Sequence, residues 1–196
     1  EQVEALKKPK ILLVDDHEEG LIALEAVLSD PAYSLVKASS GNAALRELLN
    51  EDFAVILMDV QMPELNGFET AELIKKRERS KDVPIIFLTA LKSDEHHPFR
   101  GYQAGAVDYI YKPFDPDVLR SKVAVFVELE HRRELDSLRR YRNLADAIPQ
   151  MILRFLLNGE LDYVNRTWSL FTGLDLEASH GQGWLSRLHP QDAEKL

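Results

Sequence analysis

Short apolar runs alternate with amphipathic segments over roughly the first 120 residues. The runs predict strands at 10–14, 34–38, 53–58, 84–88 and 107–111, and helical spacing predicts helices at 17–29, 42–50, 68–79, about 94–104 and after Pro116. Several of the predicted strands, such as Lys10-Ile11-Leu12-Leu13-Val14, are apolar throughout. Such strands are typical of a parallel sheet covered on both faces. The pattern therefore predicts an α/β fold with a five-stranded, doubly wound parallel sheet.

A long stretch without helix breakers follows this region. No glycine or proline occurs from Asp117 to Ile148, and Leu119, Val123 and Phe126 keep near-helical spacing after Pro116. The segment 128–134 is dominated by charge, and an apolar stripe returns from Leu135 onward. This pattern predicts a domain, a helical connector and a second domain. Pairing of the connector with a second copy is one interpretation, and a monomeric solvated helix is the other.

The last part of the chain changes pattern again. The apolar runs 151–157 and 161–164 flank Asn158-Gly159. An Asn-Gly pair between two apolar runs predicts a β-hairpin.

Composition narrows the class of protein. The 196 residues carry a formal net charge of −9, are 45% hydrophobic and include no cysteine. A disulfide framework, a cysteine-ligated zinc site and a cysteine nucleophile are therefore excluded. The acidic balance argues against a nucleic-acid binder. No apolar run approaches the roughly 18 residues of a membrane span, and the start of the sequence does not resemble a signal peptide, so we expect a cytoplasmic protein.

Acidic residues stand at the ends of two predicted strands. Asp15 and Asp16 follow the first strand, and Asp59 follows the third. A helix N-cap and a turn would explain them individually. However, the carboxyl ends of strands in an open α/β sheet form the ligand crevice, so we expect all three carboxylates to converge there. Such a cluster needs a cation, and Mg²⁺, or Mn²⁺ in its place, suits oxygen ligands.

Two further strand ends supply complementary groups. Thr89 follows the fourth strand and Lys112 follows the fifth. A metal ion, an ammonium and a hydroxyl together can receive a phosphoryl group. A carboxylate in such a pocket can act as the nucleophile and form an acyl phosphate.

These residues belong to a set of motifs that resembles the receiver domain of bacterial response regulators. The motifs are Val14-Asp15-Asp16, Leu57-Met58-Asp59-Val60-Gln61-Met62-Pro63, Asn66-Gly67, Leu88-Thr89-Ala90, Gly105-Ala106-Val107-Asp108-Tyr109 and Lys112-Pro113-Phe114. The resemblance covers about residues 9–128 and implies a flavodoxin-like fold. It also implies a cis Lys112-Pro113 bond.

The same resemblance implies a role for each site residue. Asp59 would be the phosphoacceptor, with Lys112 and Thr89 contacting the phosphoryl group. Asp16, Asp15, Asp59 and the backbone carbonyl of Gln61 would bind Mg²⁺. Thr89 and Tyr109 would form the conformational switch, although a plain core aromatic is the alternative for Tyr109. Gln61 and Leu91 would tune the lifetime of the phosphorylated state.

The C-terminal segment resembles the first half of a PAS domain. The resemblance rests on the hairpin around Asn158-Gly159, on Tyr163-Val164-Asn165 with Thr172-Gly173, and on His189-Pro190-Gln191-Asp192. We therefore expect a receiver domain over 1–128, whose last helix, 116–128, continues onward. A helical linker over 129–146, with possible coiled-coil pairing, and the N-terminal half of an α+β PAS-like domain over 147–196 would follow. A small dimerisation cap of another fold is the alternative for this last segment.

The expected function is phosphorelay signalling. The resemblance implies a sensor histidine kinase or a histidine phosphotransfer protein as phosphoryl donor, and a homodimer formed through the linker and the PAS-like segment. No organic cofactor is predicted. The sequence has no catalytic motif of an output enzyme. The expected output beyond it is that of a sensor histidine kinase, a cyclic-dinucleotide enzyme or an adaptor, and the sequence leaves these three open. Two alternatives stay open: a pseudo-receiver that serves as a dimerisation scaffold, and an aspartyl-phosphate phosphatase.

Overall fold

A five-stranded parallel sheet forms the centre of the N-terminal unit. The computed structural model describes residues 8–90, 108–181 and 183–187. The strands are β1 (Lys10–Val14), β2 (Ser34–Ala38), β3 (Val55–Asp59), β4 (Ile85–Thr89) and β5 (Asp108–Tyr111). Their order across the sheet is β2-β1-β3-β4-β5, with every neighbouring pair parallel. The predicted doubly wound parallel sheet is confirmed, and its order reverses beside β1.

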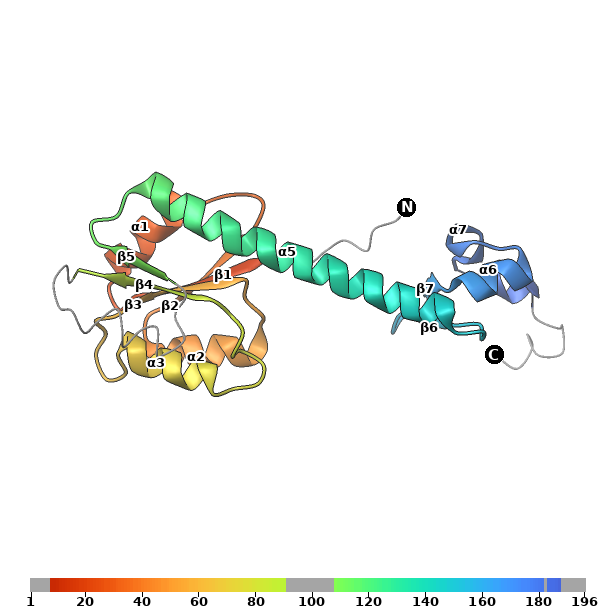
Figure 1. Cartoon of the computed structure of the whole chain (residues 1–196), viewed down its shortest axis with the longest axis horizontal. Coiled ribbons are helices and arrows are strands. Elements are labelled where there is room, and N and C mark those ends of the chain that lie inside the picture. The colour runs from red at the N-terminus through yellow and green to blue at the C-terminus, as the bar shows by residue number, and fades with distance from the viewer. Residues whose placement is uncertain (1–7, 91–107, 182, 188–196) are drawn as a thin grey trace. The chain divides into compact units, whose positions relative to one another are not determined.

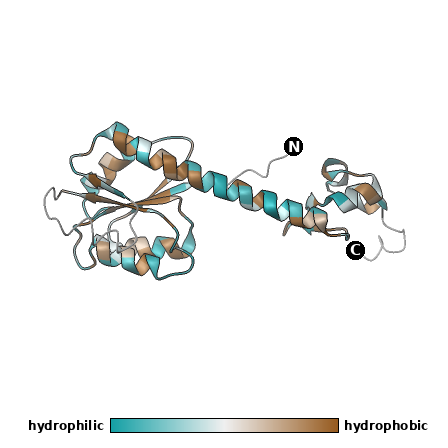
Figure 2. Ribbon diagram, viewed as in Figure 1, coloured by the Kyte–Doolittle hydropathy of each residue, from teal (hydrophilic) through white to brown (hydrophobic). Residues whose placement is uncertain are grey.

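Helices cover both faces of this sheet (Figure 1). They are α1 (Glu18–Leu28), α2 (Gly41–Asn50), α3 (Gly67–Lys75) and α5 (Pro116–Ala147). One apolar cluster joins α2 and α3 to one face, and a second joins α1 and the first turns of α5 to the other. In β1, Leu12 belongs to the first cluster and Leu13 to the second. This alternation explains why the central strands are apolar throughout, and Figure 2 shows them as hydrophobic ribbons between the helices.

Most predicted element boundaries differ from the observed ones by one or two residues, and three of the differences matter for the site or have a clear cause. Asp59 and Thr89 are the last residues of β3 and β4, because Asp59 still pairs with Leu88 and Thr89 with Tyr111. The helix expected to reach residue 79 ends at Lys75. There Ser80 Oγ donates to Ile74 O at 2.8 Å, which favours a turn over continued helix. The helix expected near 94–104 lies outside the described residues.

The long helix α5 runs without a break from Pro116 to Ala147. Its first turns bury Leu119 and Val123 against the sheet. Over residues 128–134 it carries mainly charged side chains, including the pair between Arg132 and Glu128 at 2.8 Å. The stretch without glycine or proline thus forms one continuous helix, as predicted. In the described part of the chain, no helix is both long and apolar enough to cross a membrane.

The chain divides into two compact units, Glu1–Arg133 and Glu134–Leu196. The second unit contains the last part of α5, an antiparallel pair of β6 (Leu153–Phe155) and β7 (Leu161–Val164), and the helices α6 (Arg166–Thr172), α7 (Leu176–Ser179) and η1 (Gly183–Arg187). The predicted hairpin is confirmed, with Gly159 at a φ of 85°. Trp168 is buried and donates from its indole to Ser179 Oγ at 3.0 Å.

Candidate functional site

Three of the predicted site residues meet at the carboxyl ends of the strands. Asp15 follows β1, Asp59 ends β3 and Lys112 follows β5. The Lys112 ammonium donates to Asp15 Oδ2 at 2.8 Å and to Asp59 Oδ2 at 3.0 Å. The backbone of Lys112 is placed by its N–H, which donates to Thr89 O at 2.7 Å. The parallel sheet therefore brings together groups that lie almost 100 residues apart in the sequence.

Water has little access to the charged groups of this cluster, which strengthens the interactions between them. The Asp15 side chain is 1% exposed, that of Asp59 9% and that of Lys112 28%. Burial by itself lowers the pKa of Lys112, but the hydrogen bonds and charges of Asp15 and Asp59 outweigh it and raise this pKa above its ordinary value. Lys112 is therefore a protonated amine at neutral pH and compensates two carboxylates that water hardly reaches.

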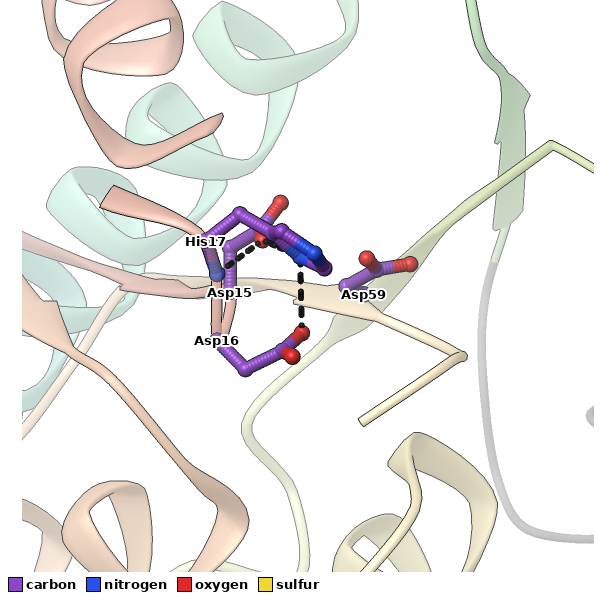
Figure 3. A group of neighbouring side chains, drawn as sticks. All are labelled: Asp15, Asp16, His17 and Asp59. Carbon is purple, nitrogen blue, oxygen red and sulfur yellow. Dashed lines mark hydrogen bonds and ion pairs between the residues drawn. The ribbon is translucent and has the colours of Figure 1, made fainter. Parts of the chain in front are cut away.

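Asp16 and His17 border the same cluster (Figure 3). One oxygen or nitrogen from each of Asp15, Asp16, His17 and Asp59 lies within 4.8 Å of the others, which makes them a group that could hold a metal ion. Asp16 Oδ1 is buried and accepts no hydrogen bond of good geometry from any described residue. His17 Nδ1 lies 3.1 Å from it, but this approach meets only the distance criterion of an ion pair.

Glycines give two of the acidic residues their space. A Cβ added to Gly20 in α1 would stand 2.4 Å from Asp15 Oδ2. A Cβ added to Gly67, at the start of α3, would stand 2.4 Å from the backbone oxygen of Asp59. The sequence pattern Asn66-Gly67 pointed to the second position, whereas nothing in the local sequence marked Gly20. Its role follows only from how α1 packs beside β1.

Of the other predicted site residues, Thr89 and Gln61 contact residues of the cluster, whereas Tyr109 packs against Phe87. Thr89 is buried at the end of β4, and Gln61 N donates to Asp59 Oδ1 at 3.4 Å. Tyr109 is partly buried, and its ring centroid lies 5.5 Å from that of Phe87. The predicted cis bond between Lys112 and Pro113 is present. Leu91 lies outside the described residues.

The arrangement matches a known family. A model of the response regulator receiver domain matches residues 11–124. The chain belongs to this receiver family. A PAS domain model matches residues 139–195, so the receiver domain is followed by a PAS segment. Receiver domains are units of two-component signalling, and they generally bind Mg²⁺ through an acidic cluster.

The alignments with two sequence relatives extend beyond the receiver domain of this chain. The chain is 34% identical over 160 residues to a probable cyclic di-GMP phosphodiesterase of Vibrio cholerae. This alignment covers 82% of the chain but only 34% of that protein. It is 33% identical over 162 residues to the transcriptional regulatory protein YrkP of Bacillus subtilis, covering 81% of the chain and 63% of that protein. The chain thus spans between a third and two thirds of these relatives.

Solved structures show the same fold for the first unit. The chemotaxis protein CheY4 of Vibrio cholerae is 30% identical, with a TM-score of 0.57 over 60% of this chain and 98% of that one. The receiver domain of a sensor histidine kinase from Pseudomonas aeruginosa, solved with a magnesium ion in its active site cleft, is 31% identical. It gives a TM-score of 0.56 over 61% of this chain and 98% of that one.

Proposed function

We propose that the receiver domain accepts a phosphoryl group on Asp59 from a phosphohistidine in a histidine kinase or phosphotransfer protein. The observation that carries this proposal is the double hydrogen bond from Lys112 to Asp15 and Asp59. It holds the Asp59 carboxylate beside a positive charge at the sheet edge where ligands of such folds bind. An inert scaffold would not need two buried carboxylates against one partly buried amine.

The side chains fit a divalent cation. Asp15, Asp16 and Asp59 would hold it through carboxylate oxygens, together with the backbone carbonyl of Gln61. Asp16 Oδ1 is buried and has no good hydrogen bond among the described residues, so a bound cation would satisfy it. Hard oxygen ligands of this kind suit Mg²⁺ or Mn²⁺. When bound, the ion would neutralise charge on the phosphoryl oxygens.

The reaction is a displacement at phosphorus. An oxygen of the Asp59 carboxylate attacks the phosphorus of the phosphohistidine and forms an O–P bond. The N–P bond breaks, and the leaving imidazole nitrogen takes up a proton. In this proposal Lys112 would pair with one phosphoryl oxygen, and the Thr89 hydroxyl with another. The product is an aspartyl phosphate, one for each chain.

Thr89 and Tyr109 are the proposed switch residues. Thr89 ends β4 and Tyr109 lies in the neighbouring strand, packed against Phe87. Movement of the Thr89 hydroxyl toward a phosphoryl group would open space that the Tyr109 ring can enter. Gln61, two residues after the phosphoacceptor, is proposed to control access of the hydrolytic water, as is Leu91.

The state of the receiver domain is proposed to pass along α5 to the PAS segment. This helix is continuous from the sheet to Ala147, and it leaves Val125, Leu129 and Tyr141 exposed. Exposed apolar side chains on a charged helix favour association of two copies. The output activity would reside in a further domain, for which the cyclic di-GMP phosphodiesterase relative suggests cyclic-dinucleotide chemistry.

Intact mass after incubation with acetyl phosphate and Mg²⁺ tests the proposed chemistry. We expect one phosphoryl group on the wild-type chain and none on Asp59→Asn. Omission of Mg²⁺ should abolish the adduct as well. A matched control is Asp52→Asn, which changes an exposed acidic residue of the same unit.

The outcomes separate the candidate functions. Absence of an adduct, both from acetyl phosphate and from a phosphorylated histidine kinase domain, would contradict the proposal and favour the scaffold. Repeated turnover of small phosphomonoesters would favour the phosphatase. An adduct retained in Asp59→Asn would assign the phosphoacceptor to another residue.

A further inference from the structure

His17 stands at the mouth of the acidic cluster with a fixed backbone. Its N–H donates to Asp15 Oδ1 at 2.9 Å, and its carbonyl accepts from Gly20 and Leu21 in the first turn of α1. It occupies the N-cap position of α1, yet its side chain makes no capping hydrogen bond. Histidine is also a poor N-cap residue compared with Ser, Asp or Asn. Helix capping therefore does not explain the imidazole.

The imidazole points at the carboxylates although it is largely exposed. His17 Nδ1 lies 3.1 Å from Asp16 Oδ1 and 3.5 Å from Asp15 Oδ1, while 74% of its side chain is exposed (Figure 3). Lys112 binds the Oδ2 atoms of Asp15 and Asp59, whereas His17 approaches the Oδ1 atom of Asp15. The ligands of one ion held at about 2.0–2.2 Å lie within roughly 4.4 Å of one another. The distances from His17 to both carboxylates fall within this limit.

The types of ligand atom decide which ion a metal site prefers. Mg²⁺ favours oxygen ligands and keeps several waters, so an imidazole adds little to its binding. Zn²⁺ and Co²⁺ bind imidazole nitrogen together with carboxylate oxygen, and tightly. We propose that His17, with Asp15 and Asp16, makes this pocket a site for Zn²⁺ or Co²⁺ that competes with Mg²⁺. This inference rests on the metal site of the proposed function and adds a nitrogen ligand to it.

The consequence is regulation by the choice of metal. An ion bound through both His17 and Asp16 would hold these side chains together at the entrance to Asp59. Occupation by Zn²⁺ would then exclude Mg²⁺ from the same carboxylates. Phosphorylation of this receiver domain would depend on the ratio of the two ions as well as on the phosphoryl donor.

Titration calorimetry of the metal-free, unphosphorylated chain tests the proposal. His17→Gln keeps a polar side chain of similar reach and removes no capping hydrogen bond, so folding should be unchanged, which circular dichroism will verify. We expect the Kd for Zn²⁺ to rise at least tenfold, because loss even of an outer partner of a metal ligand has effects of that size. The Kd for Mg²⁺ should change less than about twofold.

Two controls define the site. His180→Gln removes an exposed histidine of the other unit and should leave both Kd values unchanged. Asp16→Asn should weaken both ions, since they share this carboxylate. In the wild-type chain, added Mg²⁺ should raise the apparent Kd for Zn²⁺. The visible absorption of bound Co²⁺ should change in His17→Gln, because the nitrogen ligand is lost.

Metal-binding results can overturn the role of His17 without bearing on phosphorylation of Asp59. Equal Zn²⁺ affinity of the wild type and His17→Gln, parallel loss of Mg²⁺ and Zn²⁺ in that variant, or absence of competition would overturn the role of His17. None of these results involves phosphorylation. A chain that binds Zn²⁺ through His17 but never forms an adduct with Mg²⁺ would instead contradict the phosphoacceptor proposal.

Discussion

The absence of a side chain at Gly20 leaves space for the carboxylate of Asp15. Inside a helix, replacing Gly by Ala ordinarily stabilises by about 1 kcal/mol. Here the new methyl group would stand 2.4 Å from Asp15 Oδ2 and 2.7 Å from its Cγ. Either the carboxylate or the helix must move, so the usual gain in stability is opposed by a displaced ligand.

We therefore expect Gly20→Ala to weaken Mg²⁺ binding by roughly tenfold, the scale on which disturbed metal surroundings act. Titration calorimetry measures this change. Glu19→Ala, at the exposed neighbouring position, is the control and should bind Mg²⁺ like the wild type. Unchanged affinity in Gly20→Ala would mean that α1 shifts and Asp15 does not.

Lys112 compensates two carboxylates that are nearly buried. Lys112→Met keeps the apolar stem and removes the ammonium, which leaves Asp15 and Asp59 facing each other without a counter-charge. Removing one partner of a fully buried pair costs about 3–5 kcal/mol, and less is expected here because Lys112 is 28% exposed. We expect a loss of roughly 1–3 kcal/mol in the free energy of unfolding without divalent cations.

Mg²⁺ should reverse much of this loss, because a cation that binds only the folded chain stabilises it by mass action. Urea unfolding with and without Mg²⁺ measures both effects. Lys122→Met, in which the altered amine pairs with Asp108 away from the cluster, should show no larger response to Mg²⁺ than the wild type. A Mg²⁺ response equal in Lys112→Met and wild type would contradict this account.

At the scale of elements, one buried amide joins three segments of the second unit. Asn165 is 1% exposed, and its Nδ2 donates to Ala145 O at 2.9 Å and Gln150 O at 2.8 Å. Its Oδ1 accepts from Ile152 N at 3.0 Å and from Trp168 N at 3.2 Å. The end of α5, the entry to β6 and the first turn of α6 are thereby held by a single side chain that uses both its donors and its acceptor.

Asn165→Asp should destabilise this unit by roughly 2–4 kcal/mol, because a carboxylate oxygen would face two carbonyl oxygens without a proton to share. Tryptophan fluorescence during urea unfolding reports the change. The same substitution at the exposed Asn158 should have little effect. A midpoint for Asn165→Asp equal to that of Asn158→Asp would show that the amide donors are dispensable.

At the scale of the molecule, two compact units share one helix. Both tryptophans of the chain, Trp168 and Trp184, belong to the second unit. Their fluorescence therefore follows that unit alone, whereas far-ultraviolet circular dichroism follows helices of both. The two signals can be compared in one unfolding experiment.

Phe87→Ala should lower the stability of the receiver unit by about 3–5 kcal/mol, since this ring is fully buried in its core. We expect the circular dichroism transition to split or shift, while the tryptophan transition keeps its midpoint. Asn165→Asp should instead lower the midpoint of the tryptophan transition, together with the part of the dichroism transition that the second unit contributes. If Phe87→Ala moves the tryptophan midpoint as far as the dichroism midpoint, the units unfold as one.

The sequence by itself determined the strand order along the chain, the long helix, the hairpin at Asn158-Gly159 and the positions of Asp15, Asp59 and Lys112 at strand ends. These features follow from periodicity and from local breakers, which act over a few residues. Helix ends were less predictable, as the termination at Lys75 shows, because a side chain from beyond the helix competes for its last carbonyls.

Only the tertiary structure decided which atoms meet. The contacts of Lys112 with Asp15 and Asp59 span 97 and 53 residues, and their distances depend on how neighbouring strands align. The need for glycine at position 20 depends on where α1 begins beside β1. Local propensity carries no information on such approaches, because they arise when separate elements pack on one sheet.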